Sequence, residues 1–191
     1  MKNRQARQQI VAGYDEMIEE YIIGGYQPFF LNFMFNQIPT SNGQRLDIMV
    51  SEVTRVHEIL CRHSVRKPKS EEWRFLRPIF IGCHDLPVWK RDKTEIMDFL
   101  INGGLHFNAI ALVRPPARTD MHKKVQELLM GKQSRLTVPL DEHFRTKAKF
   151  YHNAVLARIH TTPITYGTMS DYMLKTFKHG RVGPDSIQVW K

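Results

Sequence analysis

The chain has 191 residues, of which 42% are hydrophobic and 10% aromatic. This composition excludes a disordered chain and is typical of one globular domain with a substantial core. Lys and Arg number 28 against 19 Asp and Glu, a net charge of +9 that is spread along the chain. Such a basic surface favours nucleic acid as the partner, because Lys and Arg contacts to phosphates dominate non-specific affinity. An ordinary basic soluble protein is the alternative.

The cysteine pattern and the hydropathy exclude several other classes. Cys61 and Cys83 show no CxxC or Cys/His zinc spacing, so neither a disulfide scaffold nor a zinc finger is indicated. No apolar run reaches the length of about 18 residues that a membrane helix needs. The basic start of the chain lacks the apolar core of a signal peptide. We expect a cytoplasmic protein with free thiols and no membrane contact.

Three elements are predicted at the beginning of the chain. Residues 5–23 form a helix, because apolar side chains recur there at intervals of three and four, and Gly24-Gly25 ends it. The aromatic run PFFLNFMFN at 28–36 is bounded by a proline and by the loop-forming sequence PTSNG, which favours a central strand. Residues 47–63 form an amphipathic helix.

The middle of the chain alternates strands with short connections. A basic loop, RHSVRKPK at 62–69, leads to a strand at 76–86 (LRPIFIGCHDL). A short helix follows at 92–101, where Asn102-Gly103-Gly104 ends it. The next strand, at 105–113, is stopped by two prolines.

The last part of the chain completes an α+β pattern. It contains a charged helix at 121–132, a strand at 151–161 and a helix at 168–178. No repeat or linker interrupts the sequence, so residues 1–191 are expected to form a single domain, with a core at about 28–178 and an N-terminal helix within 1–25. Strands joined by short connections favour an antiparallel sheet with helices packed on it.

The strand at 105–113 carries His106 and Asn108 two positions apart in an apolar run. Side chains alternate between the faces of a strand, so these two point the same way. His84 would join them if the strands are antiparallel neighbours, and Asp85 would take its place if a bulge shifts the register. Imidazole, amide and carboxylate ligands suit Mg²⁺ or Mn²⁺. The alternative is a hydrogen-bonded core histidine, with His84-Asp85 beginning a turn before Pro87.

The last predicted helix places Tyr172 and Lys175 one turn apart on the same side. A tyrosine hydroxyl is a poor nucleophile unless a cation lies close by, and a lysine can stabilise the charge that develops on a phosphate. The pair therefore suggests attack on a phosphodiester. Because the pattern YxxK also occurs by chance, an exposed helix surface is the alternative.

These motifs, taken in order, resemble those of the HUH endonucleases. The similarity rests on the aromatic strand FFLNFMF, a strand ending in His84-Asp85, the strand GGLHFNAIAL and the late YMLK helix, and it spans roughly residues 28–178. Within that superfamily the chain looks most like the single-tyrosine initiators of rolling-circle replication in plasmids and phages. The resemblance implies an antiparallel sheet of about five strands, with a metal held on its HUH strand and a nucleophilic tyrosine on a facing helix.

The resemblance also implies roles for individual residues. His106 matches the first HUH histidine, Tyr172 the nucleophile and Lys175 the motif lysine, while His84 stands where the family completes its metal set. Asn108 departs from the pattern, because it occupies the place of the second histidine. The implied reaction is a nick in single-stranded DNA that leaves a 5′-phosphotyrosine and a free 3′-hydroxyl.

The implied partners are single-stranded or origin DNA, a host helicase, because the chain has no room for a helicase domain, and a polymerase. Basic residues after the second predicted helix and around the end of the last one are expected to contact DNA phosphates: Arg62, Arg66, Lys67, Lys69, Lys178 and Arg181.

Two other functions stay open at this point. Because Asn108 is uncharged, the chain could be a catalytically inactive nucleic-acid-binding domain of the same fold. It could also be an unrelated basic α+β protein, such as an RNA-binding module. In that case aromatic residues of the first strand, Phe29, Phe33 and Phe35, would lie exposed on the sheet.

Overall fold

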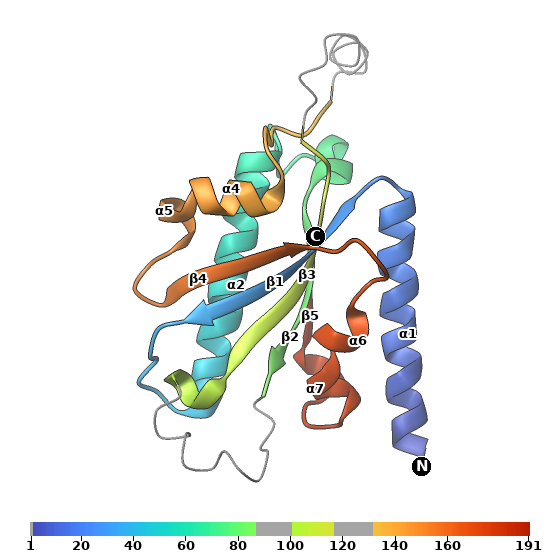
Figure 1. Cartoon of the computed structure of the whole chain (residues 1–191), viewed down its shortest axis with the longest axis vertical. Coiled ribbons are helices and arrows are strands. Elements are labelled where there is room, and N and C mark those ends of the chain that lie inside the picture. Colours follow the sequence, from blue (N-terminus) through green and yellow to red (C-terminus); the bar gives the residue numbers. More distant parts are fainter. Residues whose placement is uncertain (1, 87–100, 117–131) are drawn as a thin grey trace.

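The structure, a computed structural model, describes residues 2–86, 101–116 and 132–191 (Figure 1). The helices predicted at 92–101 and 121–132 lie outside these ranges, apart from one residue each. Within the described residues, no helix is both long enough and apolar enough to cross a membrane. Cys61 and Cys83 are buried and unpaired, as the lack of a disulfide pattern predicts.

Five strands form one antiparallel sheet in the order β4-β1-β3-β2-β5. The strands are β1 (Gln27–Phe35), β2 (Ile79–Asp85), β3 (His106–Val113), β4 (Leu156–Pro163) and β5 (Ile187–Trp190). The predicted α+β architecture with a five-stranded antiparallel sheet is confirmed. The strand that carries His106 and Asn108 lies at the centre of the sheet, where it is hydrogen-bonded on both sides.

One face of the sheet is covered by α2 (Asn42–Ser64), α4 (Leu140–Thr146) and α5 (Ala148–Tyr151) (Figure 1). Alternate residues of β1 enter this core, and Phe29, Phe33 and Phe35 are all buried there. They are therefore not available to stack on RNA bases, and the exposed aromatic face that an RNA-binding sheet needs is absent at these positions.

The opposite face is covered by α1 (Lys2–Ile23), α6 (Ser170–Met173) and α7 (Lys175–Lys178) (Figure 1). Its apolar core joins Ile81 and Ile110 of the sheet to Ile18 of α1 and to Met173 and Phe177 of the C-terminal helices. The charged and polar residues of the candidate site lie on this same face.

Several boundaries differ from the predicted ones. The strand predicted at 76–86 is shorter, because residues before it form the 3-10 helix η1 (Glu71–Leu76). The strand predicted at 151–161 begins only at Leu156, and the helix predicted at 168–178 is split at Leu174 into α6 and α7. Two further 3-10 turns, η3 (Ile101–Gly104) and η4 (Pro184–Ser186), precede β3 and β5.

A buried polar cluster holds α4 and α5 against the end of α2. The hydroxyl of Tyr151 lies 2.9 Å from Nδ1 of His63 and 2.8 Å from Nε2 of His143, so it bridges the two rings. Burial, together with the neighbouring His63 and Lys147, lowers the pKa of His143 to about 4. The cluster therefore needs His143 neutral.

This requirement predicts a loss of stability on acidification. An unfolded histidine takes up a proton near pH 6.5, but folded His143 does so only near pH 4, so its contribution is complete above about pH 6.5 and declines below it. From about pH 7 to about pH 5, urea denaturation should show the free energy of unfolding falling by about 2 kcal/mol less in His143→Leu than in the unsubstituted protein. The exposed His179→Leu is the control and should keep the original pH dependence. An unchanged pH dependence in His143→Leu would contradict the prediction.

Candidate active site

The candidate site is built around the carboxylate of Asp85, the last residue of β2. Asp85 is directly opposite His106 in the β2–β3 register, and Cys83 is opposite Asn108. Opposed residues in a sheet share a face, so Asp85, His106 and Asn108 project to the same side. The side chain of Asp85 is only 2% exposed.

Both oxygens of this carboxylate are fully engaged. Oδ2 accepts from Nζ of Lys175 at 2.6 Å, lies 2.9 Å from Nε2 of His106 and accepts from Nδ2 of Asn108 at 3.1 Å. Oδ1 accepts from the hydroxyl of Thr176 at 2.9 Å. A buried charge is tolerated when it is paired and hydrogen-bonded in this way. The contacts also connect β2, β3 and α7 at one point.

The electrostatics of the cluster favour its charged forms. Burial alone would raise the pKa of Asp85, but hydrogen bonds from His106, Lys175 and Thr176 outweigh it and lower that pKa to about 2. Burial works against protonation of His106, yet its contacts with Asp85 and Gly104 raise the pKa of His106 above the ordinary value. The site thus holds one carboxylate against a lysine ammonium and a histidine that protonates readily.

A second layer of hydrogen bonds orients the side chains around Asp85. Nδ2 of Asn32, on β1, donates to Oδ1 of Asn108 at 2.9 Å. Nδ1 of His106 lies 3.1 Å from the carbonyl oxygen of Gly104, which places a proton on Nδ1. When His106 is neutral, its Nε2 then has a free lone pair on the side of Asp85.

Tyr172 lies beside this cluster, on α6. Its side chain is 49% exposed, its ring packs edge-to-face against Phe30 of β1, and Nζ of Lys175 lies 4.7 Å from the centre of the ring. Lys175 therefore contacts both the carboxylate and the tyrosine. The structure brings together Tyr172, Lys175, His106 and Asn108, four of the residues that the sequence singled out.

The segment before Tyr172 is anchored to α1. Asp15 of α1 accepts hydrogen bonds from the hydroxyls of Thr168 and Ser170. Met169 occupies the N-cap position of α6, with a left-handed φ of 55°. Helix α1 thus anchors the start of α6, the helix that carries the tyrosine.

The expectation that His84 joins the site is wrong. Its neighbour in the register is Phe107, which faces the α2 side of the sheet, and the His84 and Phe107 rings pack edge-to-face with their centres 5.0 Å apart. Burial lowers the pKa of His84. Asp85 occupies the position instead, and it does so in regular pairing, without the bulge that the sequence argument required.

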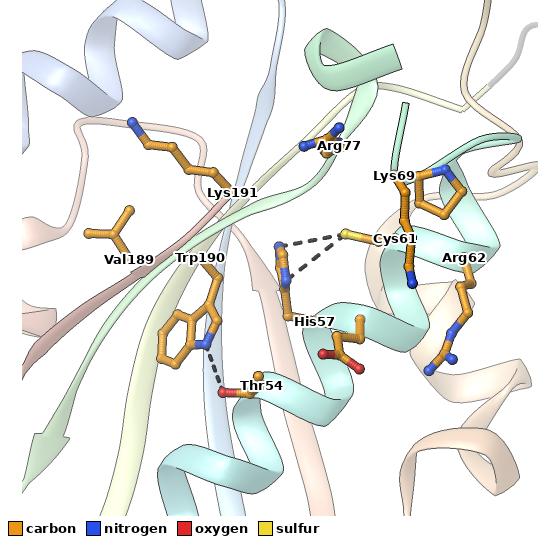
Figure 2. Close-up of a pocket in the computed structure, with 11 residues that line it drawn as sticks. Thr54, His57, Cys61, Arg62, Lys69, Arg77, Val189, Trp190 and Lys191 are labelled. Carbon is orange, nitrogen blue, oxygen red and sulfur yellow. Dashed lines mark hydrogen bonds between the residues drawn. The ribbon is translucent and has the colours of Figure 1, made fainter. Parts of the chain in front are cut away.

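The six basic residues expected to bind DNA lie in different surroundings. Arg62 and Lys69 line a cavity of about 550 Å³ between α2 and the end of β5, which Figure 2 shows. Arg66 and Lys67 are exposed just beyond α2. At α7, Lys178 forms an ion pair with Asp171 at 2.6 Å, and Arg181 is exposed after the helix.

The side chains of Asp85, His106 and Asn108 are of the types that ligate a hard divalent cation. A cation there would compete with Lys175 and His106, which already contact Oδ2 of Asp85. The Asn108 amide can present its oxygen instead of its nitrogen if the Asn32 amide turns with it. The described residues contain no group of three or more His, Cys, Asp and Glu side chains arranged for a metal. The set around Asp85 includes only two residues of these types, and the third donor is an amide.

Two members of the cluster were not found from the sequence. Asn32 is the only polar residue between Phe29 and Phe35, and its position on the face shared with Phe30 is the signal that could have identified it. Thr176 follows Lys175 directly, and its hydroxyl donates to Asp85 from α7, a contact for which its sequence position offers no signal.

Comparison of the chain with models of known protein families finds no match, and comparisons with curated proteins and with solved structures find none either.

The burial of Asp85 predicts a large effect on stability. Asp85→Ala leaves Lys175 and His106 without their common partner, so the free energy of unfolding, measured by urea denaturation near neutral pH, should fall by about 2–3 kcal/mol. Asp171→Ala is the matched control, because it removes an ion pair of the same 2.6 Å length on the surface. It should change stability by no more than about 0.5 kcal/mol. Equal effects of the two substitutions would show that the buried cluster stabilises the fold no more than a surface ion pair does.

Proposed function

We propose that this protein is a metal-dependent endonuclease of the HUH type that nicks single-stranded DNA through Tyr172 and so initiates rolling-circle replication of a plasmid, a phage or another mobile element. The observation that carries the proposal is the position of Lys175. Its ammonium group contacts the Asp85 carboxylate, which His106 and Asn108 also contact, and it lies 4.7 Å from the centre of the Tyr172 ring.

In this proposal Tyr172 is the nucleophile. Its hydroxyl oxygen forms a bond to the phosphorus of a DNA phosphodiester as the bond from phosphorus to the 3′-oxygen breaks. The phenol loses its proton and the departing 3′-oxygen gains one, which leaves a 5′-phosphotyrosine and a 3′-hydroxyl. The half-exposed side chain of Tyr172 supports this role, because an extended strand can reach it without any movement of the core.

Lys175 stabilises negative charge in the reaction. Its ammonium group is close enough to the tyrosine ring to attract the phosphate that approaches it and to stabilise the charge that develops there. Asp85 holds the lysine in place, and Thr176 fixes the other oxygen of the same carboxylate.

Asp85, His106 and Asn108 are the residues that would hold the cation, Mg²⁺ or Mn²⁺. Such an ion, when bound, supplies Lewis-acid polarisation of the scissile phosphate. Lys175 contacts Oδ2 of Asp85, while Asn32 and Gly104 orient the side chains of Asn108 and His106 through hydrogen bonds.

The partners follow from this chemistry. A nick with a free 3′-hydroxyl provides a primer for a polymerase, and a helicase is needed to supply the single strand. The net charge of +9 supports a nucleic acid as the substrate.

The test is covalent capture of the DNA. Wild-type protein incubated with single-stranded origin DNA and Mn²⁺ should form an adduct that survives denaturation and is seen as a shifted band in a denaturing gel. Tyr172→Phe should abolish the adduct because it removes the attacking oxygen, and EDTA should abolish it by removing the cation.

Tyr166→Phe is the control for the nucleophile. Tyr166 is 90% exposed and lies six residues earlier, outside the cluster, so its substitution should leave the adduct unchanged. The proposal fails if no adduct forms, or if Tyr166→Phe removes it as completely as Tyr172→Phe does.

The second candidate is a catalytically inactive DNA-binding domain. The full neutralisation of Asp85 by protein groups favours it, because Lys175 and His106 already satisfy the charge that a cation would satisfy. This candidate predicts DNA binding that depends on salt but is insensitive to EDTA and to Tyr172→Phe.

A further inference from the structure

Two adjoining cavities lie at the edge of the sheet formed by β5, at the end opposite to Asp85. The first, of about 550 Å³, lies between α2 and the C-terminal end of β5. The second, of about 540 Å³, lies between the end of α1, η1 and the start of β2. Arg77 and Lys191 line both cavities, so the two cavities adjoin, and together they are called the groove.

The groove is strongly basic. The first cavity presents Arg62 and Lys69 in addition to the two shared cations, against a single acidic residue, Glu58. The side chains of Arg62 and Lys69 make no hydrogen bond or ion pair with another residue in the described part of the chain, and the buried Nε of Arg77 has no hydrogen-bond partner there either. Clustered cations without matching carboxylates attract polyanions.

Aromatic rings alternate with these charges. Trp190 forms a wall of the first cavity, where its indole nitrogen donates to Thr54 at 2.9 Å (Figure 2). The second cavity is lined by Tyr21 and by Phe75, whose side chain is 42% exposed. Nζ of Lys191 lies 6.0 Å from the centre of the Tyr21 ring, so charge and ring are adjacent.

We infer that this groove, defined by Arg62, Lys69, Arg77, Lys191, Trp190 and Phe75, binds a single strand of nucleic acid. Basic side chains that follow a backbone and aromatic rings that accept unpaired bases are the two parts of such a site. A duplex would not use the rings, because its bases are already stacked. A free phosphate or one nucleotide would occupy only part of two joined cavities.

The groove is separate from the Asp85 cluster. Trp190 pairs with Phe80 in the sheet, and Asp85 lies five residues further along β2, roughly 17 Å away at about 3.4 Å per residue. Residues 80 and 85 also face opposite sides of the sheet. The second cavity, however, includes Tyr21 of α1 and Ile79, which belong to the face of the cluster, so a strand that fills the groove emerges on the face where Tyr172 lies.

The inference that the groove binds a single strand rests on its own charges and aromatic rings. Only the choice of DNA rather than RNA as the ligand rests on the proposed nickase function. It provides a place for the strand to one side of the nick and would keep that strand bound after cleavage.

The test measures binding of a fluorescent single-stranded DNA of about 20 nucleotides, long enough to exceed the usual site size of one domain. The double variant Arg62→Ala, Lys69→Ala should bind about tenfold more weakly at low salt, and the slope of log affinity against log salt should fall by about 1.4, or about 0.7 for each lost phosphate contact. Phe75→Leu keeps an apolar side chain but removes the ring, and it should lose about fivefold or more.

The matched control is Lys149→Ala, Arg158→Ala. It removes the same charge from exposed positions, and neither residue lines the two cavities. It should change affinity and salt slope much less. Equal losses in both double variants would indicate general electrostatic attraction and would overturn the inference. Unchanged binding in the Arg62→Ala, Lys69→Ala variant would also overturn it.

Competition experiments distinguish between the possible ligands. Unlabelled single-stranded DNA and RNA of the same length should compete, while the matching duplex, inorganic phosphate and AMP should compete poorly. Competition by AMP as strong as by the strand would overturn the inference. If binding depends on the groove but no covalent adduct forms with Tyr172, the nickase proposal fails and the groove stands. If the adduct forms and the groove variants bind normally, only the groove is wrong.

Discussion

The contacts of the Asp85 carboxylate are the constraint on which the functional face of this protein depends. A carboxylate that is almost completely buried must be compensated, and four side chains from β3 and α7 do so. Because these donors come from separate elements, the same contacts fix α7 against the sheet. The position of Tyr172, on the helix α6 that precedes α7, is therefore coupled to the burial of one charge. An apolar residue in place of Asp85 could pack, but it could not hold Lys175 next to the tyrosine.

The sequence was sufficient to predict which residues of β3 share a face, since the period of a strand is two residues and needs no tertiary information. It was not sufficient to choose between His84 and Asp85. That choice depends on the register of β2 against β3, and the connection between them, residues 86–105, is too long for its turn chemistry to set the pairing. The regular pairing of Asp85 with His106 places Asp85, not His84, on the face of the site. Asn108, which lies opposite Cys83, is tolerated in a buried strand because it donates a hydrogen bond to Asp85.

The parts of the fold that the residues alone did not predict are those determined by tertiary contacts. Strand β5 has only four residues and pairs with β2 alone, so its pattern is too short to stand out from a loop. The break at Leu174 interrupts a sequence that has ordinary helical spacing. Contacts of Thr176 and Lys175 with Asp85 favour the break, because the two side chains must approach one carboxylate from adjacent positions. Local propensity contains no information about such a partner.

The charge balance of the cluster indicates what it can recognise. One carboxylate faces the ammonium of Lys175 and an imidazole whose pKa is raised, so the cluster is neutral to positive even before a cation is added. The positive charge lies next to Tyr172, on a surface that solvent can reach. A site of this kind attracts an anion to the tyrosine rather than a cationic or neutral ligand, and a bound divalent ion would strengthen the same preference. The proposal that a phosphate approaches Tyr172 is therefore supported by the protein's own charges, independently of the choice of metal.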